Sequence, residues 1–318
     1  MKIWNIKNHK EEHEIEIGDI TILNGQHIQW HNLIHSIDGY FNVKQSEVQL
    51  YEDNLPVNKK DWNCFMIPFD AAVQLNKITA KSPLKDVQSN ISEQIAYSAF
   101  FQELQEVWEQ LNDELQLINK QMKSWGLTST LKPFEEKDIN NFVKFHASDN
   151  SSLSPIEIKK LLLNLILKKP FDKKTLIIIE LPELYATKDE LINLHHIMDK
   201  AIEKGYRFLI VSQEIEQGIQ NYYYKDKIIN TALLGKMKSK VQKETPFHCS
   251  DELYKDATNT FIQLVDNTIT EGKLLKQNQN NGAIVTIIHI IMYNLNIESF
   301  YDIHGLEPNL MKFITDYR

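Results

Sequence analysis

The chain opens with alternating apolar and polar positions and later carries longer apolar runs. Residues 3–23 alternate and predict two or three short strands, and Asn24-Gly25 ends this stretch before a helix expected over residues 26–37. Further strands are predicted over residues 48–51 and 64–68. The second of these is continuously apolar, which favours a central strand of a sheet.

The next segment has a helical pattern. Residues 86–125 contain no proline or glycine, and their main apolar positions alternate in spacing between four and three. These positions are Leu104, Trp108, Leu111, Leu115, Ile118, Met122 and Trp125. Such a heptad seam predicts one helix of about 40 residues, on the order of 60 Å long. A helix of this length should project as an arm and pack against returning helices, expected over residues 134–145 and from Ser154 onward.

A strand, a helix and a strand follow one another after the arm. Ser154-Pro155-Ile156-Glu157 and Thr187-Lys188-Asp189-Glu190 both carry the residues of a helix capping box. The apolar runs 176–179 and 208–211 flank the second box, and Gly205 ends its helix. This order predicts a right-handed βαβ unit with parallel strands, and residues 227–230 add one more short strand.

These elements predict an α/β protein in three parts. Residues 1–85 and 170–235 form an α/β head, and an all-α helical arm of residues 86–169 is inserted into it. The composition becomes lysine-rich after Gly235, and residues 236–318 are expected to form a C-terminal helical extension.

Polar residues stand at the ends of two predicted strands. Glu180 follows the run 176–179, and Ser212-Gln213 follow the run 208–211. P-loop NTPases use such groups to hold magnesium and to sense phosphate. The loop 23–27, between a strand and a helix, nevertheless has one glycine and no lysine or serine, so the chain lacks the phosphate-binding motif. We therefore expect a P-loop-ATPase-like head with a degenerate nucleotide site that takes no ATP. Two alternatives are a nucleotide-dependent ATPase or switch that uses Glu180, and ordinary strand-end carboxylates at Glu180 and Glu183.

The net charge, the cysteines and the apolar segments limit the functions and cellular locations that we expect. A formal charge of −8 argues against a surface that binds nucleic acid all over, but it allows a local basic channel. Cys64 and Cys249 lie far apart, which is unlike a disulfide framework and fits a reducing cytoplasm. The first 16 residues lack the apolar core of a signal peptide, and the run 283–293 is too short to span a bilayer. We expect a cytoplasmic protein without a membrane partner.

Two groups of side chains could bind metal. His27, His31 and His35 recur every four residues along one helical face. Two of them could share a metal, but the sequence shows no third ligand beside them, and a solvated or half-buried histidine face is the alternative. Acidic residues of the arm could collect a hard cation such as calcium, or could simply form its charged outer face. These residues are Glu106, Glu109, Asp113 and Glu114.

Lysines gather in doublets and in one later cluster, and these are the candidate DNA-binding residues. They are Lys159, Lys160, Lys168, Lys169, Lys173, Lys174, Lys236, Lys238 and Lys240. Oligomerisation could bring them into a groove for DNA phosphates, with binding that is independent of sequence and strongly dependent on salt. Lys168 and Lys169 end a predicted helix, where they could instead complement its dipole.

The order of these parts resembles a known family. A strand–loop–helix start without a phosphate motif precedes a strand that ends in Phe69-Asp70 just before the arm. The string Ala186-Thr187-Lys188-Asp189-Glu190 then opens the crossover helix. This arrangement, over roughly residues 15–230, resembles the Csn-two family, the DNA-end-binding ring proteins of subtype II-A CRISPR systems. The tail after Gly235 is similar to the longer branch of that family.

The resemblance implies a non-enzymatic homotetrameric ring that surrounds double-stranded DNA without sequence preference. It implies a role in spacer acquisition beside the CRISPR integrase and the effector nuclease. It also implies calcium bound by acidic residues of the arm, for which Glu109, Asp113 and Glu114 are the candidates. A coiled-coil scaffold without a nucleic acid partner is a further alternative that the arm alone would support.

Overall fold

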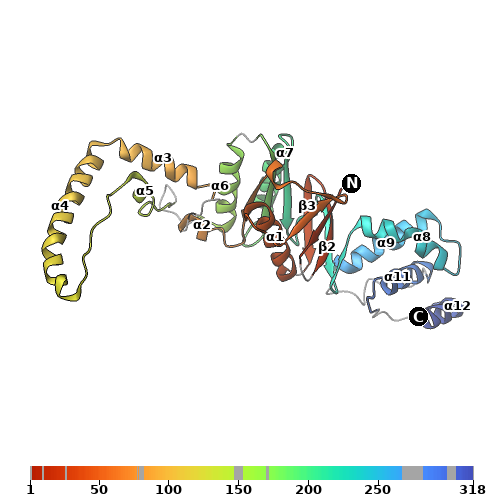
Figure 1. Cartoon of the computed structure of the whole chain (residues 1–318). Coiled ribbons are helices and arrows are strands. Elements are labelled where there is room, and N and C mark those ends of the chain that lie inside the picture. The colour runs from red at the N-terminus through yellow and green to blue at the C-terminus, as the bar shows by residue number, and fades with distance from the viewer. Residues whose placement is uncertain are drawn as a thin grey trace. The chain divides into compact units, whose positions relative to one another are not determined.

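The structure of the chain is a computed structural model, which describes residues 2–8, 11–25, 27–76, 78, 82–146, 153–169, 172–266, 282–298 and 306–317 (Figure 1). The chain forms two compact units. Residues 1–69 and 171–318 make up the first, here called the head unit, and residues 70–170 make up the second, the arm unit.

The main sheet of the head unit has six strands. Their order is β10 (Lys227–Ile229), β9 (Ile219–Tyr224), β3 (Ile20–Gly25), β8 (Tyr206–Val211), β7 (Lys174–Glu180) and β6 (Trp62–Ile67). Neighbouring strands from β9 to β6 are parallel, and β10 pairs with β9 in the antiparallel sense. Residues 175–180 of β7 are all buried, as expected for a strand covered on both faces.

A second sheet of four antiparallel strands lies in the same unit. It runs in the order β2 (Glu12–Ile17), β1 (Lys2–Lys7), β4 (Gln49–Glu52) and β5 (Leu55–Pro56), followed by the turn η1 (Lys59–Asp61). Helix α1 (His27–Asn42) follows β3 and packs against β6, β7 and β4. Its buried residues Trp30, Leu33, Ile34 and Ile37 share one apolar core with both sheets.

Helix α7 (Lys188–Ile202) makes the crossover from β7 to β8 and packs against β8. Its predicted capping box is confirmed. The Thr187 hydroxyl accepts a hydrogen bond from the backbone N–H of Glu190 at 3.3 Å, and the Glu190 carboxylate accepts one from the backbone N–H of Thr187 at 2.7 Å. The parallel pairing of β7 with β8 confirms the predicted βαβ unit.

Among the described residues after the main sheet, the helices are α8 (Thr231–Glu244), α9 (Asp251–Asp266), α11 (Gly282–Asn294) and α12 (Pro308–Asp316). Their buried side chains form one core with Tyr224 of β9 and Ile229 of β10. The C-terminal helices therefore complete the head unit by packing on the edge of its sheet. None of the helices that the structure describes is long and apolar enough to cross a membrane.

The arm unit contains α2 (Val73–Asn76), α3 (Lys85–Ala96), α4 (Ala99–Met122), the turn η2 (Lys123–Trp125), α5 (Glu136–Ile139) and α6 (Pro155–Leu167). The prediction of one unbroken helix over residues 86–125 is wrong, because the helix is interrupted at Tyr97-Ser98. Ser98 caps α4 and accepts a hydrogen bond from the backbone N–H of Phe101 at 3.3 Å. The capping box predicted at Ser154 and Glu157 is confirmed at the start of α6.

Helix α4 contacts a segment without regular secondary structure, residues 127–135, in place of the expected helix. The indole of Trp108 donates to the carbonyl of Lys132 at 2.7 Å, and the side chain of Asn112 accepts from the backbone N–H of Leu131 at 3.1 Å. The helix predicted over residues 134–145 is reduced to the four residues of α5. Seam residues therefore stay exposed, including Leu104 at 44% and Leu111 at 43%.

Candidate functional site

The carboxyl ends of the parallel strands meet at one edge of the main sheet, where ligands of open α/β sheets bind. Glu180 is the last residue of β7, and its side chain is fully buried. Strand β6 lies on one side of β7, and β8 and then β3 lie on the other. The loop after β3 leads directly into α1, so the first turns of this helix begin at the same edge.

Glu180 is held by two histidines and one backbone group. Oxygen Oε1 of Glu180 lies 2.7 Å from Nε2 of His27 and 2.7 Å from Nδ1 of His31. The other oxygen, Oε2, accepts a hydrogen bond from the backbone N–H of Phe69 at 3.0 Å. Three segments that are far apart in sequence thus converge on one carboxylate.

The helical repeat of α1 explains why both histidines reach the same oxygen. His27 and His31 are one turn apart on one face of the helix, and their ring centroids are 5.6 Å apart. The ring of Phe69 stands edge-on to both imidazoles, at 5.9 Å from His27 and 6.4 Å from His31. His35 continues the row and contacts His31, with ring centroids 4.3 Å apart.

The carboxylate is ionised despite its burial. Burial raises the pKa of Glu180, but hydrogen bonds from His31, from the backbone N–H of Phe69 and from His27 outweigh this effect and bring the pKa below its ordinary value. The site therefore keeps a buried negative charge near neutral pH. The two imidazoles beside it are about one third exposed, at 32% for His27 and 36% for His31.

Among the residues that the structure describes, one group of three side chains has the arrangement of metal ligands. It consists of His27, His31 and Glu180, whose ligand atoms lie within 4.8 Å of one another. The sequence indicated the histidine row and the strand-end glutamate separately, and it showed no third ligand for the histidines. Their convergence follows from the strand order, because a helix after β3 must cross the ends of neighbouring parallel strands to cover the sheet.

The loop before α1 is shaped by packing rather than by a phosphate motif. Gly25 has a φ of +118°, and a Cβ atom there would lie 2.8 Å from the carbonyl oxygen of Tyr223 in β9. The carbonyl of Asn24 accepts from the Trp30 indole at 2.9 Å, and that of Gly25 accepts from the Gln213 side chain at 3.1 Å. Gln26 lies outside the described residues. The single glycine of this loop is thus explained by its contact with β9.

Two further polar residues of the predicted nucleotide site have structural partners. The carboxylate of Glu183 accepts a hydrogen bond from the backbone N–H of Gln213 at 2.9 Å, which joins the loops after β7 and β8. The hydroxyl of Ser212 accepts from the backbone N–H groups of Glu214 and Ile215, at 3.2 and 3.1 Å. These contacts stabilise the turns at the sheet edge.

The acidic residues of the arm are the predicted calcium ligands. Glu106, Glu109, Asp113 and Glu114 are all exposed on α4. They do not form a converging ligand group among the described residues, whereas calcium takes six to eight oxygen ligands around one point. Calcium binding by these residues stays a prediction.

The predicted DNA-binding lysines fall into three classes. Lys159 is only 1% exposed, because it lies on the buried face of α6 with Ile156 and Leu163, so it is poorly placed for a phosphate contact. Ion pairs engage four others: Lys169 with Asp86, Lys236 with Glu14 at 2.7 Å, Lys238 with Asp251 at 2.9 Å and Lys240 with Glu244 at 4.0 Å.

The remaining lysines are the better candidates for contacts with phosphate. Lys168 and Lys173 are exposed, and Lys160 is half-buried. Lys174 is also exposed, with its ammonium 5.5 Å from the centroid of the Trp62 ring. The DNA-binding role of the whole set stays a prediction.

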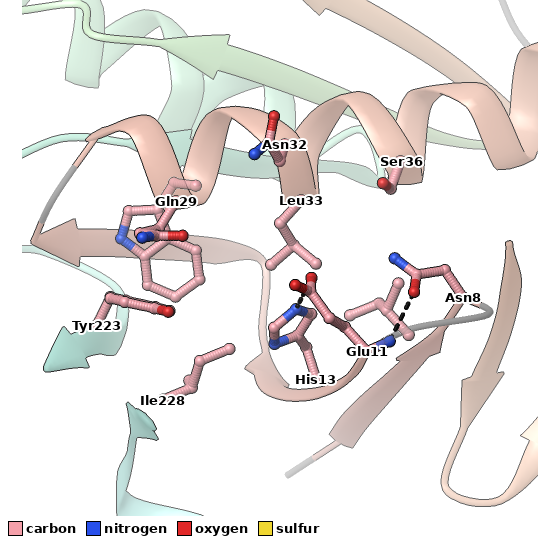
Figure 2. Close-up of a pocket in the computed structure, with 11 residues that line it drawn as sticks. Asn8, Glu11, His13, Gln29, Asn32, Leu33, Ser36, Tyr223 and Ile228 are labelled. Atoms are coloured by element: carbon pink, nitrogen blue, oxygen red, sulfur yellow. Dashed lines mark hydrogen bonds and ion pairs between the residues drawn. The ribbon is translucent and has the colours of Figure 1, made fainter. Parts of the chain in front are cut away.

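A pocket of about 80 Å³ lies on a different face of α1. Figure 2 shows Leu33 of the helix pointing toward Glu11 and His13, and Tyr223 and Ile228 also line the pocket. The backbone N–H of Glu11 donates to Asn8 at 2.7 Å, and the Glu11 carboxylate lies 3.2 Å from His13. Ligand pockets usually measure about 300–1,000 Å³, so this cleft is too small for a substrate of ordinary size.

Comparison with known proteins shows likeness in structure and not in sequence. The chain matches no protein-family model and no curated protein. Its structure is similar to that of Stu0660 of Streptococcus thermophilus, with 16% sequence identity, a TM-score of 0.51 and coverage of 98% of this chain and 99% of that chain. The predicted α/β fold with additional helical parts is confirmed.

Two other solved structures with some likeness are ATP-binding cassettes. One is MJ1267, an ATP-binding cassette of an ABC transporter, with 13% identity, a TM-score of 0.39 and coverage of 72% of this chain and 90% of that chain. The other is cbiO1 from Clostridium perfringens, part of the ABC transporter complex cbiONQ, with 13% identity, a TM-score of 0.38 and coverage of 76% and 93%. These scores are too low for any conclusion beyond the likeness itself.

Proposed function

We propose that the chain is a non-catalytic, sequence-independent binder of double-stranded DNA ends that acts in spacer acquisition of a subtype II-A CRISPR system. The observation that carries this proposal is the set of contacts around Glu180 at the carboxyl edge of the main sheet. His27 and His31 both contact Oε1 of Glu180. A P-loop ATPase would need a strand-end carboxylate such as this one to hold magnesium. The order of elements that resembles the Csn-two family is also present, with the arm unit inserted between β6 and β7.

The alternative of a nucleotide-dependent switch has less support. Glu180 is fully buried, and its two oxygens already accept hydrogen bonds from the protein. Residues 23–27 offer no lysine for a phosphate, and the carbonyls of Asn24 and Gly25 are engaged by Trp30 and Gln213. Magnesium and a triphosphate would have to displace these contacts before binding.

Assembly would supply the DNA-binding surface. The net charge of −8 means that a single copy has few regions able to attract DNA. Lys160, Lys168, Lys173 and Lys174 would be gathered into a positively charged channel by a ring of four copies. The exposed apolar residues of α4, including Leu104 and Leu111, favour self-association of the arm. The ring would work in the cytoplasm beside the CRISPR integrase and the effector nuclease.

The test compares linear and closed-circular DNA of one sequence. We expect the full-length protein to be an oligomer by light scattering, to bind the linear form preferentially and to be indifferent to base sequence. Calorimetric titration with ATP and magnesium at millimolar concentration should give no heat of binding. A monomer that does not distinguish linear from circular DNA would contradict the proposal, and saturable ATP binding would favour the nucleotide-dependent switch.

A further inference from the structure

We propose that His27, His31 and Glu180 bind one divalent transition-metal ion, with Zn²⁺ as the best match. Such a site does not depend on DNA binding and can be tested without it. It would place a metal at the sheet edge where related folds hold a nucleotide, and it would join α1, β7 and the chain after β6 at a single point.

The donor set selects the class of metal. Two imidazole nitrogens and one carboxylate oxygen suit zinc and its neighbours in the first transition row. Calcium and magnesium prefer oxygen ligands only, and a site dominated by nitrogen is a poor match for both. Catalytic zinc sites often use two histidines and a glutamate, with water in the fourth position. The partial exposure of both imidazoles leaves room for such a water.

The contacts around Glu180 prepare one of its oxygens for this role. The backbone N–H of Phe69 holds Oε2 at 3.0 Å, which fixes the plane of the carboxylate. Oxygen Oε1 then faces Nε2 of His27 and Nδ1 of His31, the two atoms that would share the metal. A hydrogen bond to the oxygen that does not ligate is the usual outer support of a metal-bound carboxylate.

The required movement is small. Metal–ligand bonds of about 2.0–2.1 Å in tetrahedral geometry separate the ligand atoms by roughly 3.3 Å. The present separations from Oε1 to each nitrogen are 2.7 Å, so the imidazoles would need to move outward by only a fraction of an ångström. Both side chains are partly exposed, so neither ring is enclosed on all sides.

Electrostatics also favours a cation at this point. The carboxyl group of Glu180 has no solvent exposure, and burying such a group is costly unless it has partners. The contacts with His27 and His31 offset part of this cost, and a divalent cation would offset it far more strongly. The two histidines in contact with the carboxylate are the residues that would coordinate the ion together with it.

The test uses the full-length protein with any affinity tag removed, since a histidine tag would itself bind metal. After dialysis against EDTA, ZnCl₂ is titrated calorimetrically, and CoCl₂ is added separately to record visible absorption of a bound ion. We expect one equivalent of zinc per chain and a cobalt spectrum typical of four-coordinate nitrogen and oxygen ligands. His27→Ala and His31→Ala should each weaken zinc binding by more than about 100-fold, because losing even an outer hydrogen-bond partner costs about 10- to 100-fold.

The matched control is His35→Ala. It removes a histidine from the same helix, one turn beyond His31, but leaves the three ligand atoms in place, and it should retain zinc affinity. Circular dichroism of each variant checks that the fold is intact, and His27 is exposed enough for its replacement to be tolerated. Absence of saturable zinc binding in the wild type would overturn the proposal, as would undiminished binding in a folded His27→Ala/His31→Ala double variant.

Discussion

Asn221 of β9 is hydrogen-bonded to both backbone groups of Glu16 in β2. Its Oδ1 accepts from the N–H of Glu16 at 2.7 Å, and its Nδ2 donates to the carbonyl of Glu16 at 2.9 Å. The Asn221 amide thus makes the two backbone hydrogen bonds that a neighbouring strand would otherwise make. In this way it links the two sheets of the head unit. The carboxylate of Glu16 in turn accepts from the Thr231 hydroxyl at 2.7 Å and from the backbone N–H of Ala232 at 3.1 Å, at the start of α8.

Replacing Asn221 should therefore destabilise the head unit strongly. Asn221→Ala would leave the backbone N–H and carbonyl of Glu16 without their buried partner, together with the Asn230 amide, which donates to Asn221 at 3.0 Å. We expect a loss of at least about 3 kcal/mol in the free energy of unfolding, since each of these three buried polar groups left unpaired costs about 1–3 kcal/mol. Urea unfolding monitored by fluorescence measures this change in the free energy of unfolding. Asn5→Ala, which removes an exposed hydrogen bond to Glu12, should cost less than about 1 kcal/mol.

Glu52 of β4 should make stability depend on pH in the acid range. Burial raises its pKa, but the ion pair with Lys2, the Trp4 indole and nearby Arg207 lower it, so that the pKa lies below the ordinary value of 4.5. A carboxyl with a depressed folded pKa stabilises the protein above its unfolded pKa, and this contribution is lost as pH falls through the folded pKa.

The pH dependence expected from Glu52 is checked by measuring the free energy of unfolding of the wild type and of Glu52→Gln from pH 7 to pH 3. The difference in free energy of unfolding should be constant near neutral pH and should shrink below about pH 4.5. Lys2→Gln removes the ion pair and should reduce the pH dependence while leaving the Trp4 hydrogen bond at 3.0 Å intact. A difference that stays unchanged down to pH 3 would contradict the prediction.

The parts of the fold that local sequence determines were predictable. The capping boxes at Ser154 and Thr187 are confirmed because side chains three residues apart satisfy each other's backbone groups without help from the rest of the chain. Strand β7 was also predictable, since a strand covered on both faces consists of a continuous apolar run in the sequence.

Features that depend on distant contacts were not predictable in the same way. The break at Tyr97-Ser98 rests on one serine cap inside an otherwise continuous helical pattern. The meeting of His27 and His31 with Glu180 depends on the order β6–β7–β8–β3, which brings together residues more than 140 positions apart. A single sequence shows which residue types are present at strand ends, but it does not show which ends are neighbours.

The exposed seam of α4 should mediate self-association. Leu104 and Leu111 are 44% and 43% exposed, and apolar residues repeated along one helical face favour helix–helix contacts. Leu104→Asp/Leu111→Asp should lower the mass measured by sedimentation velocity without lowering the helix content. Gln110→Asp adds charge to the same helix outside the seam and should leave the mass unchanged. An unchanged mass in the double variant would show that assembly uses another surface.

The exposed lysines should set the salt dependence of DNA binding. If Lys168, Lys173 and Lys174 each neutralise a phosphate, every alanine replacement should release one counterion fewer, and the slope of log K against log salt should become shallower by about 0.9 per lysine replaced. Fluorescence anisotropy with a linear duplex between low and moderate salt gives these slopes. Lys200→Ala removes an exposed lysine of α7 outside the predicted set and should leave the slope unchanged. A triple variant whose slope matches that of the wild type would place the DNA-binding surface elsewhere, because removing a lysine that neutralises a phosphate must change counterion release.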